Sequence, residues 1–264
     1  MLLEGKTMVV TGGNSGIGEA VVLAAAGEGA NLVIDYLVHP EETTALISRI
    51  EAAGGAAVGV HADVSKVAGL HRMVATAVDT FGRLDVLVNN AGVETRTSIL
   101  ETSEADYDKV MEINLKSAFF GTQLAAKQFI AQGGGGIIIN ISSVHEDWPM
   151  PGNVAYCVSK GGTRMLTRTA GVALGPHGVR VVNVAPGAVA TPLNAATMAD
   201  PAKMTTLYPT TPFGPPAQPA ELADRVVFLA SGPYSSLPAT SASLVGCVLP
   251  PSLAFLSAPP PHRP

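Results

Sequence analysis

Residues 6–20 read KTMVVTGGNSGIGEA: a short apolar run, a glycine-rich loop and the start of a stretch with helical spacing. Glycine lacks a Cβ, so the backbone at Gly12, Gly16 and Gly18 can turn tightly and approach an anion closely. The helix that follows points its unpaired N–H groups at the same place. A strand, such a loop and a helix in this order predict a first βα turn that binds the phosphates of a nucleotide.

Five further apolar runs, rich in Val, Ile and Leu, alternate with longer stretches of helical spacing such as residues 104–132. This alternation predicts parallel strands joined by helices that cover both faces of one sheet. We therefore expect an α/β protein with a Rossmann-type doubly wound parallel sheet in three layers, forming a single domain over residues 1–264. The five runs lie at residues 30–36, 56–64, 84–92, 135–143 and 179–187.

The composition suits a buried sheet and argues against several classes of protein. The 264 residues are 47% hydrophobic and only 14% charged, and the net charge of −5 argues against binding to nucleic acid. Cys157 and Cys247 form neither a disulfide framework nor part of a metal cluster. No apolar run reaches the roughly 20 residues of a membrane span, and no signal peptide is visible. We expect a cytoplasmic protein without a metal or a membrane partner.

The composition changes after residue 200, where fourteen of the 20 prolines lie. Residues 219–231 still predict a helix, because Pro219 and Glu221 are typical of a helix start. Beyond about residue 232 we expect a Pro-rich tail with at most one strand, near residues 243–249.

Polar residues follow the other predicted strands at the edge where ligands bind in such sheets. Asp35 ends the second strand, where an acid commonly meets the ribose hydroxyls of a dinucleotide. Asp63 and Val64 follow the third strand and offer a carboxylate and a backbone amide to an adenine ring. Residues 89–92 (NNAG) end the fourth strand at the switch point. Together these residues predict one crevice.

Residues 153–162 read NVAYCVSKGG and place Tyr156 and Lys160 four residues apart, on one face of a helix. By itself such a pair is usually an ordinary surface pair. A catalytic interpretation needs support from the rest of the chain.

That support comes from a series of motifs in which the chain resembles the short-chain dehydrogenase/reductase family. The resemblance covers roughly residues 5–230, with the motifs in the order and spacing of the family. Ser143 lies 13 residues before Tyr156, as the family pattern requires. The motifs are TGGNSGIG at 11–18, DV at 63–64, NNAG at 89–92, Asn114 in MEINLKS, Ser143 in INISSV, YCVSK at 156–160 and NVAPGAVATP at 183–192.

The resemblance implies an NAD(P)-dependent oxidoreductase with four catalytic residues. Tyr156 acts as the acid or base, and Lys160 lowers its pKa and holds the nicotinamide ribose. Ser143 binds the substrate oxygen, and Asn114 holds a water for proton relay. The implied cofactor-binding residues, besides Tyr156 and Lys160, are Gly12, Asn14, Ser15, Gly16, Ile17, Gly18, Asp35, Tyr36, Asp63, Val64, Asn90, Ala91, Gly92, Pro186, Gly187, Val189 and Thr191.

Within the family, the segments NNAGVE and SSVHEDW look most like the glucose 1-dehydrogenases. By that resemblance Glu94, His145 and Glu146 are candidate contacts for a sugar, whose hydroxyls need polar partners. A 3-oxoacyl carrier-protein reductase is the alternative. A second alternative, from another class, is a catalytically silent nicotinamide-binding protein.

NAD is the expected cofactor, with NADP as the alternative. NADP-preferring relatives carry a basic residue where this chain has Ser15 or Leu37. The acid of NAD-preferring relatives falls one residue after Asp35, where this chain has Tyr36.

From about Leu237 the sequence lacks the closing Val-Thr-Gly and Asp-Gly-Gly markers of the family. A shifted reading frame and a genuinely divergent tail both remain open. Relatives form 222-symmetric tetramers through the last strand, so the resemblance implies a homo-oligomer: a tetramer, or a dimer if the altered tail weakens that interface.

Overall fold

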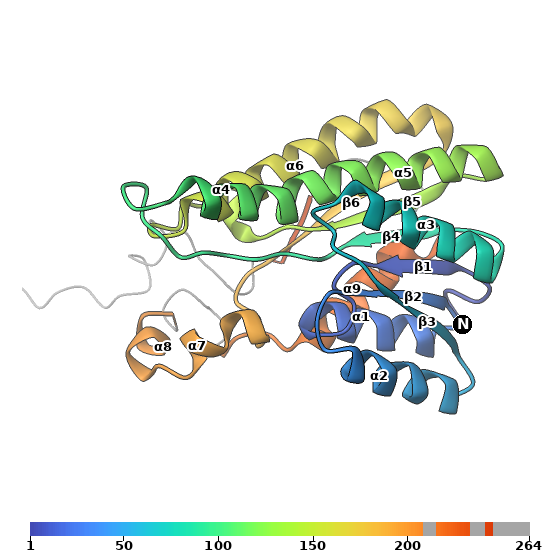
Figure 1. The fold of residues 1–264 in the computed structure, drawn as a ribbon, viewed down its shortest axis with the longest axis horizontal. Helices are drawn as coiled ribbons and strands as arrows, with labels where there is room; N and C mark the ends of the chain where they lie inside the picture. The colour runs from blue at the N-terminus through green and yellow to red at the C-terminus, as the bar shows by residue number, and fades with distance from the viewer. Residues whose placement is uncertain (208–214, 233–240, 245–264) are drawn as a thin grey trace, which may run out of the picture.

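Parallel strands form one sheet in the computed structural model, which describes residues 1–207, 215–232 and 241–244 (Figure 1). The seven strands lie in the order β3-β2-β1-β4-β5-β6-β7. The chain moves from β1 outward to β3 and then returns to β4 on the other side of β1, which confirms the expected doubly wound sheet. The strands are β1 Thr7–Val10, β2 Asn31–Tyr36, β3 Ala56–His61, β4 Val86–Asn89, β5 Gly136–Ile141, β6 Val179–Pro186 and β7 Ser241–Leu244.

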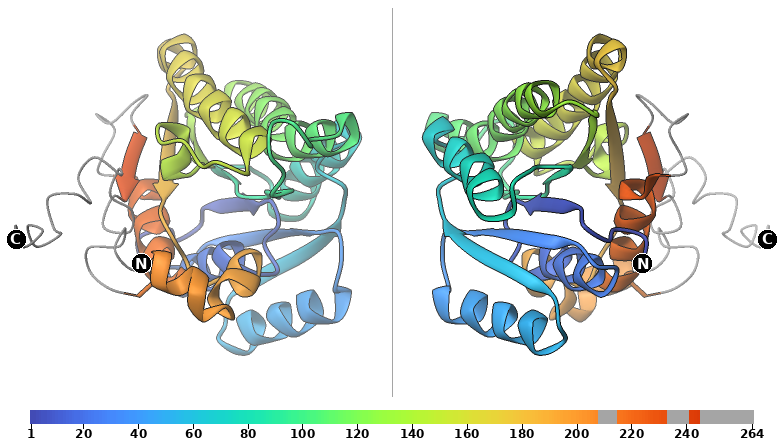
Figure 2. Two further views of the ribbon diagram at one scale, coloured as in Figure 1. Left: turned by 90° about the vertical axis from the view of Figure 1, so that its left-hand side faces the viewer. Right: turned by 90° about the vertical axis from the view of Figure 1, so that its right-hand side faces the viewer.

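Helices cover both faces of the sheet, so the fold has three layers (Figures 1 and 2). One face carries α1 Gly16–Gly27, α2 Pro40–Ala52 and α9 Pro219–Ala230; the other carries α3 Val67–Phe81, α4 Glu104–Met111, α5 Ser117–Gln132 and α6 Val154–Leu174. The short helices α7 Ala195–Met198 and α8 Pro201–Leu207 lie beyond the carboxyl ends of the strands. Among the described residues, no helix is long and apolar enough to cross a membrane.

The inner strands are apolar at consecutive positions because both of their faces are buried. Neighbouring residues of a strand point to opposite faces. Val10 and Val88 pack in the core on the side of α1 and α9, whereas Val9 and Leu87 pack with Phe129 of α5 on the other side. The continuous apolar runs of the sequence therefore correspond to strands in the middle of three layers.

The predicted helix over residues 104–132 is interrupted. Between α4 and α5 the backbone forms one π-helical turn, η1 Glu112–Lys116, which contains Asn114. Such turns are rare and often occur at functional sites. Helix α9, in contrast, matches the helix expected at residues 219–231.

The sheet contains a seventh strand, β7, besides those of the six apolar runs. β7 pairs in parallel with β6, so that Asn183 lies opposite Ser241. The strand expected near residues 243–249 thus begins two residues earlier, at Ser241. Residues 245–249 and the rest of the predicted Pro-rich tail lie outside the described residues.

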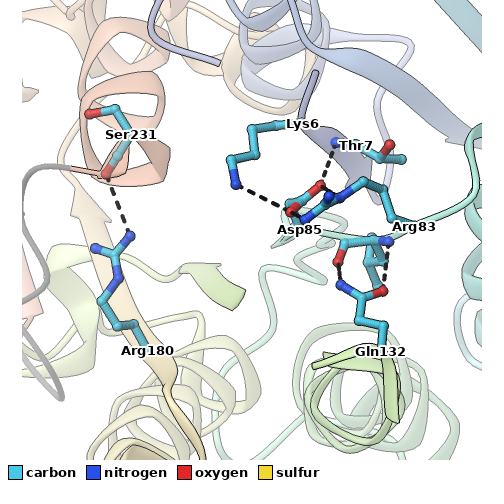
Figure 3. Close-up of polar contacts among 8 residues, drawn as sticks. Lys6, Thr7, Arg83, Asp85, Gln132, Arg180 and Ser231 are labelled. Carbon is cyan, nitrogen blue, oxygen red and sulfur yellow. Dashed lines mark hydrogen bonds and ion pairs between the residues drawn. The ribbon is translucent and has the colours of Figure 1, made fainter. Parts of the chain in front are cut away.

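A buried carboxylate joins the first and fourth strands at the end of the sheet opposite the phosphate loop (Figure 3). Asp85 accepts a hydrogen bond from the backbone N–H of Thr7 at 3.0 Å and two from Arg83, at 2.8 and 2.6 Å. Lys6 lies 3.4 Å from the same carboxylate. Although burial raises the pKa of Asp85, these partners outweigh it and hold the pKa below its usual value.

Two longer side chains anchor helices at the same end (Figure 3). Gln132, the last residue of α5, accepts a hydrogen bond from the backbone N–H of Leu84 at 3.1 Å and donates one to its carbonyl. Arg180 of β6 donates to the backbone carbonyl of Ser231, at the end of α9, at 3.5 Å. Both contacts fix a helix end to the sheet.

Replacing Asp85 with Asn should lower the free energy of unfolding by about 1 kcal/mol at neutral pH, because charge-assisted hydrogen bonds are lost. The lowered pKa means that the ionised group stabilises the fold above the unfolded pKa of about 3.9, and that this effect disappears as the pH falls through the folded pKa. Urea unfolding of wild type, Asp85→Asn and the exposed control Asp79→Asn checks this. A difference that stays constant down to about pH 3 would contradict it.

Candidate active site

A cleft of about 390 Å³ opens at the carboxyl ends of the strands, a volume suited to a small-molecule site. It brings together residues from the ends of β1, β2, β3, β4, β5 and β6 and from α6. Of the expected cofactor residues, only Gly18 and Tyr36 do not line it. Those that do are Gly12, Asn14, Ser15, Gly16, Ile17, Asp35, Asp63, Val64, Asn90, Ala91, Gly92, Tyr156, Lys160, Pro186, Gly187, Val189 and Thr191.

The phosphate loop has the geometry that its glycines predict. Gly12 and Gly16 have φ angles of 58° and 54°, in the region that favours glycine. Gly18 acts by packing: a Cβ there would lie 2.2 Å from the carbonyl oxygen of Gly12 and 2.7 Å from Nδ2 of Asn90. The loop therefore forms an open cradle, followed at once by the N-terminus of α1, that fits the phosphates of a dinucleotide.

The neighbouring strand end holds this loop in place. Nδ2 of Asn90 donates to the carbonyls of Thr11 and Gly12, at 2.9 and 3.0 Å. Oγ1 of Thr11 accepts from the backbone N–H groups of Asn90 and Ala91, at 2.9 and 3.0 Å. The organising role of the Thr11 side chain was not expected from the sequence.

Asp35 is held differently from the expectation for a ribose ligand. It is 2% exposed, and its Oδ2 accepts the N–H of Gly12 at 2.9 Å. Its backbone carbonyl accepts the N–H of Gly13 at 2.8 Å. Burial raises the pKa of Asp35 to about 7, although the hydrogen bond from Gly12 acts in the opposite direction. This carboxyl lines the cleft but also supports the phosphate loop.

Two further residues expected to contact the adenosine half of a dinucleotide, Tyr36 and Asp63, are placed differently. The Tyr36 ring packs on His61, with ring centroids 5.5 Å apart, and does not line the cleft, contrary to expectation. Its place is taken by Leu37, which is 54% exposed. Asp63 does face the cleft; burial raises its pKa, but hydrogen bonds from Ser65 outweigh this and hold the pKa below its usual value.

Ser143, Tyr156 and Lys160 meet at the inner end of the cleft. Ser143 ends the segment after β5 and caps the short helix η2 Val144–Glu146. Tyr156 and Lys160 lie one turn apart on α6, and Nζ of Lys160 is 5.5 Å from the centre of the Tyr156 ring. Nζ also donates to the carbonyl of Ile141 at 2.9 Å. The arrangement places a hydroxyl, a phenol and an ammonium around one position.

The environment of this group shifts both pKa values. Burial lowers the pKa of Lys160 to about 8, opposed by the charge of Glu146. Burial raises the pKa of Tyr156 to about 12; a hydrogen bond with Ser143 opposes this and the charge of Glu94 reinforces it. The residues of the chain alone therefore keep Tyr156 protonated at neutral pH, rather than lowering its pKa as expected from the lysine.

Asn114 lies beneath this group in the π-helical turn and does not line the cleft. Its Oδ1 accepts the N–H of Val93 at 2.8 Å, and its Nδ2 donates to the Val93 carbonyl at 2.9 Å and to Oγ of Ser159 at 3.0 Å. A Cβ at Gly92 would lie 3.6 Å from both Asn114 Oδ1 and Lys160 Nζ. Asn114 thus sits next to the lysine and fixes the backbone after β4.

Glu94, a candidate substrate contact, follows the cleft residue Val93 but does not itself line the cleft. Its partners are residues for which the sequence predicts no role. Its carboxylate pairs with Arg96 and accepts a hydrogen bond from Nδ2 of Asn153 at 2.7 Å. Arg96 has a φ of 51° and donates to Oγ1 of Thr197 on α7 at 2.6 Å. Asn153 directly precedes α6, but a lone Asn or Arg in a loop carries no recognisable signal.

The other two candidate substrate contacts, His145 and Glu146, do not line the cleft either. His145 is partly buried, which lowers its pKa, and its Nδ1 lies 3.0 Å from the carbonyl of Trp148. Glu146 is not a cleft residue, contrary to expectation: its side chain is 1% exposed and accepts a hydrogen bond from Asn183 at 2.6 Å. Nε of Arg164 lies 3.7 Å from the same carboxylate, so the Glu146 side chain is buried between α6 and β6.

Comparison with known proteins assigns the family. Residues 6–202 match the family model described as short chain dehydrogenase. The 3beta-hydroxysteroid dehydrogenase 1 of Eggerthella lenta is 38% identical over 90% of this chain and 92% of its own length. The L-rhamnose 1-dehydrogenase (NAD(P)(+)) of a Sphingomonas species is 37% identical over 87% and 91%. The glucose 1-dehydrogenase 2 of Bacillus subtilis is 37% identical over 85% and 88%.

The fold comparison agrees with the sequence comparison. A short-chain dehydrogenase/reductase from Serratia marcescens superposes with a TM-score of 0.84 at 34% identity, covering 92% of this chain and 98% of that one. The chain therefore belongs to the short-chain dehydrogenase/reductase family and is an oxidoreductase of the kind that uses NAD(P).

Replacing Gly18 with Ala should weaken NADH binding at least tenfold, because the new Cβ would overlap the Gly12 carbonyl and displace the phosphate loop. Gly27 at the other end of α1 is the matched control, since a Cβ there meets nothing within 4 Å. Gly27→Ala should leave NADH affinity unchanged. Fluorescence titration with NADH measures both variants, and equal affinities would contradict the packing argument.

Proposed function

We propose that Tyr156 exchanges a proton with the oxygen of a CH–OH or C=O group on the substrate. A nicotinamide cofactor, when bound, supplies or accepts the hydride. The single observation that carries this proposal is the meeting of Ser143, Tyr156 and Lys160 at the inner end of a cleft that begins at the phosphate loop. Ser143 holds the substrate oxygen beside the phenol and stabilises the charge that develops on it.

Lys160 supports Tyr156 through its charge and through its position. With a pKa of about 8, Lys160 is mostly protonated at neutral pH. A positive charge 5.5 Å from the phenol ring favours the phenolate and so opposes the effect of burial. We further propose that Nζ contacts the nicotinamide ribose, and that Asn114 holds a water on its remaining Oδ1 lone pair through which Lys160 exchanges protons with solvent.

The pKa of about 12 for Tyr156 bears on the direction of the reaction. A protonated phenol is ready to donate to the oxygen of a carbonyl that is being reduced. Alcohol oxidation requires the phenolate, which the positive charges of Lys160 and of an oxidised nicotinamide favour. Reduction should therefore be favoured near neutral pH and oxidation at alkaline pH.

We propose a polyhydroxylated substrate, a sugar of the glucose 1-dehydrogenase type. Glu94, whose charge acts on both Tyr156 and His145, accepts a hydrogen bond from Asn153, so a carboxylate, an imidazole and a carboxamide lie together there. Hydroxyl groups need such partners when they leave water. Two of the relatives carry names of sugar dehydrogenases. The name of a third specifies a steroid, so a less polar ketone, or the acyl chain of a 3-oxoacyl carrier-protein reductase, is the alternative substrate class.

NAD is the proposed cofactor, with NADP as the alternative. Among the described residues that line the cleft, Lys160 is the only positively charged side chain, and it lies at the nicotinamide end. At the adenosine end Leu37 is exposed and offers no charge to a 2′-phosphate. The raised pKa of Asp35 means that repulsion of that phosphate by this carboxyl is incomplete at neutral pH.

A homo-oligomer, as a tetramer or a dimer, and a cytoplasmic location remain predictions. The exposed residues Phe119 on α5 and Val158, Met165 and Val172 on α6 support an oligomer, because they form an apolar face on adjacent helices.

The proposed chemistry is tested with a panel of sugars, acyl thioesters and simple ketones, followed by NADH absorbance. Turnover of a sugar should be lost by about 10²- to 10⁴-fold in Tyr156→Phe, the usual contribution of an acid–base group, while NADH binding persists. Fluorescence titration of NADH is the control. NADH binding without turnover of any substrate would instead favour the catalytically silent nicotinamide-binding protein.

The cofactor proposal predicts that kcat/KM is higher with NAD than with NADP. Leu37→Arg should reverse this preference, because a guanidinium at this position can pair with a 2′-phosphate. Leu37→Gln is the uncharged control and should keep the preference for NAD. A tenfold preference of the wild type for NADP would refute the proposal.

A further inference from the structure

Asp35 is a buried carboxyl group with only one satisfied oxygen. Its Oδ2 accepts the N–H of Gly12, whereas its buried Oδ1 has no hydrogen-bond partner among the residues that the structure describes. An ionised carboxylate in this position gives up water on both oxygens and regains one hydrogen bond. The protonated form needs less solvation, since Oδ2 can still accept from Gly12 while Oδ1 carries the proton.

The charges around Asp35 do not compensate for its burial. Asp63, after β3, repels a negative charge on Asp35, and Arg72 on α3 attracts one. Residues 11–18, which pack against the other side of the carboxyl, contain no ionisable side chain. The pKa of about 7 is the net result, so the group is about half ionised at neutral pH.

The same loop receives the phosphates. Gly12 offers its N–H to Asp35 and borders the cleft, so a negative carboxylate lies directly behind a loop built to hold anions. A pyrophosphate brings two further negative charges to this loop. Two acidic groups that are close together cannot both be ionised at low cost, and their repulsion is large where water is excluded.

We propose that Asp35 supports the phosphate loop as a neutral carboxylic acid when a dinucleotide is bound, so that binding takes up a proton from solvent. Asp35 is then a positioning residue that acts through the N–H of Gly12. This differs from an ionised acid that accepts hydrogen bonds from the ribose. The inference rests on dinucleotide binding but not on the proposed substrate.

The direction of the pH dependence follows from the linkage between proton binding and dinucleotide binding. Below pH 6 Asp35 is already protonated in the free protein, and binding is independent of pH. Above pH 7 the free protein must first gain a proton, so the dissociation constant should rise about tenfold between pH 6 and pH 8. At pH 7 binding should take up about half a proton.

Isothermal titration calorimetry of the full chain with NADH, in two buffers of different ionisation enthalpy, measures the dissociation constant and the number of protons taken up. Asp35→Asn keeps the shape of the group and an acceptor for Gly12 but cannot ionise. Its proton uptake at pH 7 should vanish, its dissociation constant should change less than twofold between pH 6 and pH 8, and at pH 8 it should bind NADH more tightly than the wild type. The exposed-site variant Asp79→Asn should behave like the wild type.

Two outcomes would overturn the inference: a wild-type affinity that does not change with pH, or an Asp35→Asn variant that keeps the proton uptake. Asp35→Ala, which removes the acceptor for Gly12, should bind weakly at every pH, and thermal unfolding reports whether it is folded. A wild-type chain that binds no NADH would refute the cofactor proposal as well. NADH binding without proton uptake would refute the present inference alone.

Discussion

The whole site depends on how the ends of β1 and β4 are joined. These strands are neighbours in the sheet, but the chain leaves them toward opposite sides, so the space between their ends has no covering connection. Asn90 and Thr11 bridge this point with four hydrogen bonds between the phosphate loop and the segment after β4. Because Gly18 has no side chain, the first turn of α1 can pack directly against Gly12 and Asn90. The proposed cofactor and substrate sites both adjoin this junction.

Burial favours the neutral form of ionisable groups in two parts of the cleft. At the inner end it raises the pKa of Tyr156 and lowers that of Lys160, which brings the two groups closer to a state in which both are neutral. At the adenosine end it raises the pKa of Asp35 and so removes negative charge from beneath an anion site. At neutral pH Lys160 remains mostly protonated and Asp63, whose pKa is lowered, remains ionised, so these two opposite charges stay in the cleft.

Residue spacing could predict the fold and most of the cleft, because these depend on local rules. Glycine spacing defines the phosphate loop, apolar runs define buried strands, and a parallel sheet brings all of its carboxyl ends to one edge. The orientation of single side chains could not be predicted. Tyr36 packs on the exposed residue His61, and Glu146 accepts a hydrogen bond from Asn183, so neither side chain lines the cleft. The short strand β7 was placed two residues too late, because little in its sequence marks where it begins.

Arg96, in the loop after β4, has a left-handed backbone conformation. A non-glycine residue in this conformation raises the local free energy by roughly 1 kcal/mol, and its bonds to Glu94 and Thr197 compensate for this. The partly exposed side chain of Arg96 thus links the loop after β4 to helix α7. Without these bonds the strain of Arg96 would be uncompensated, so the conformation of the loop after β4 depends on a residue of α7.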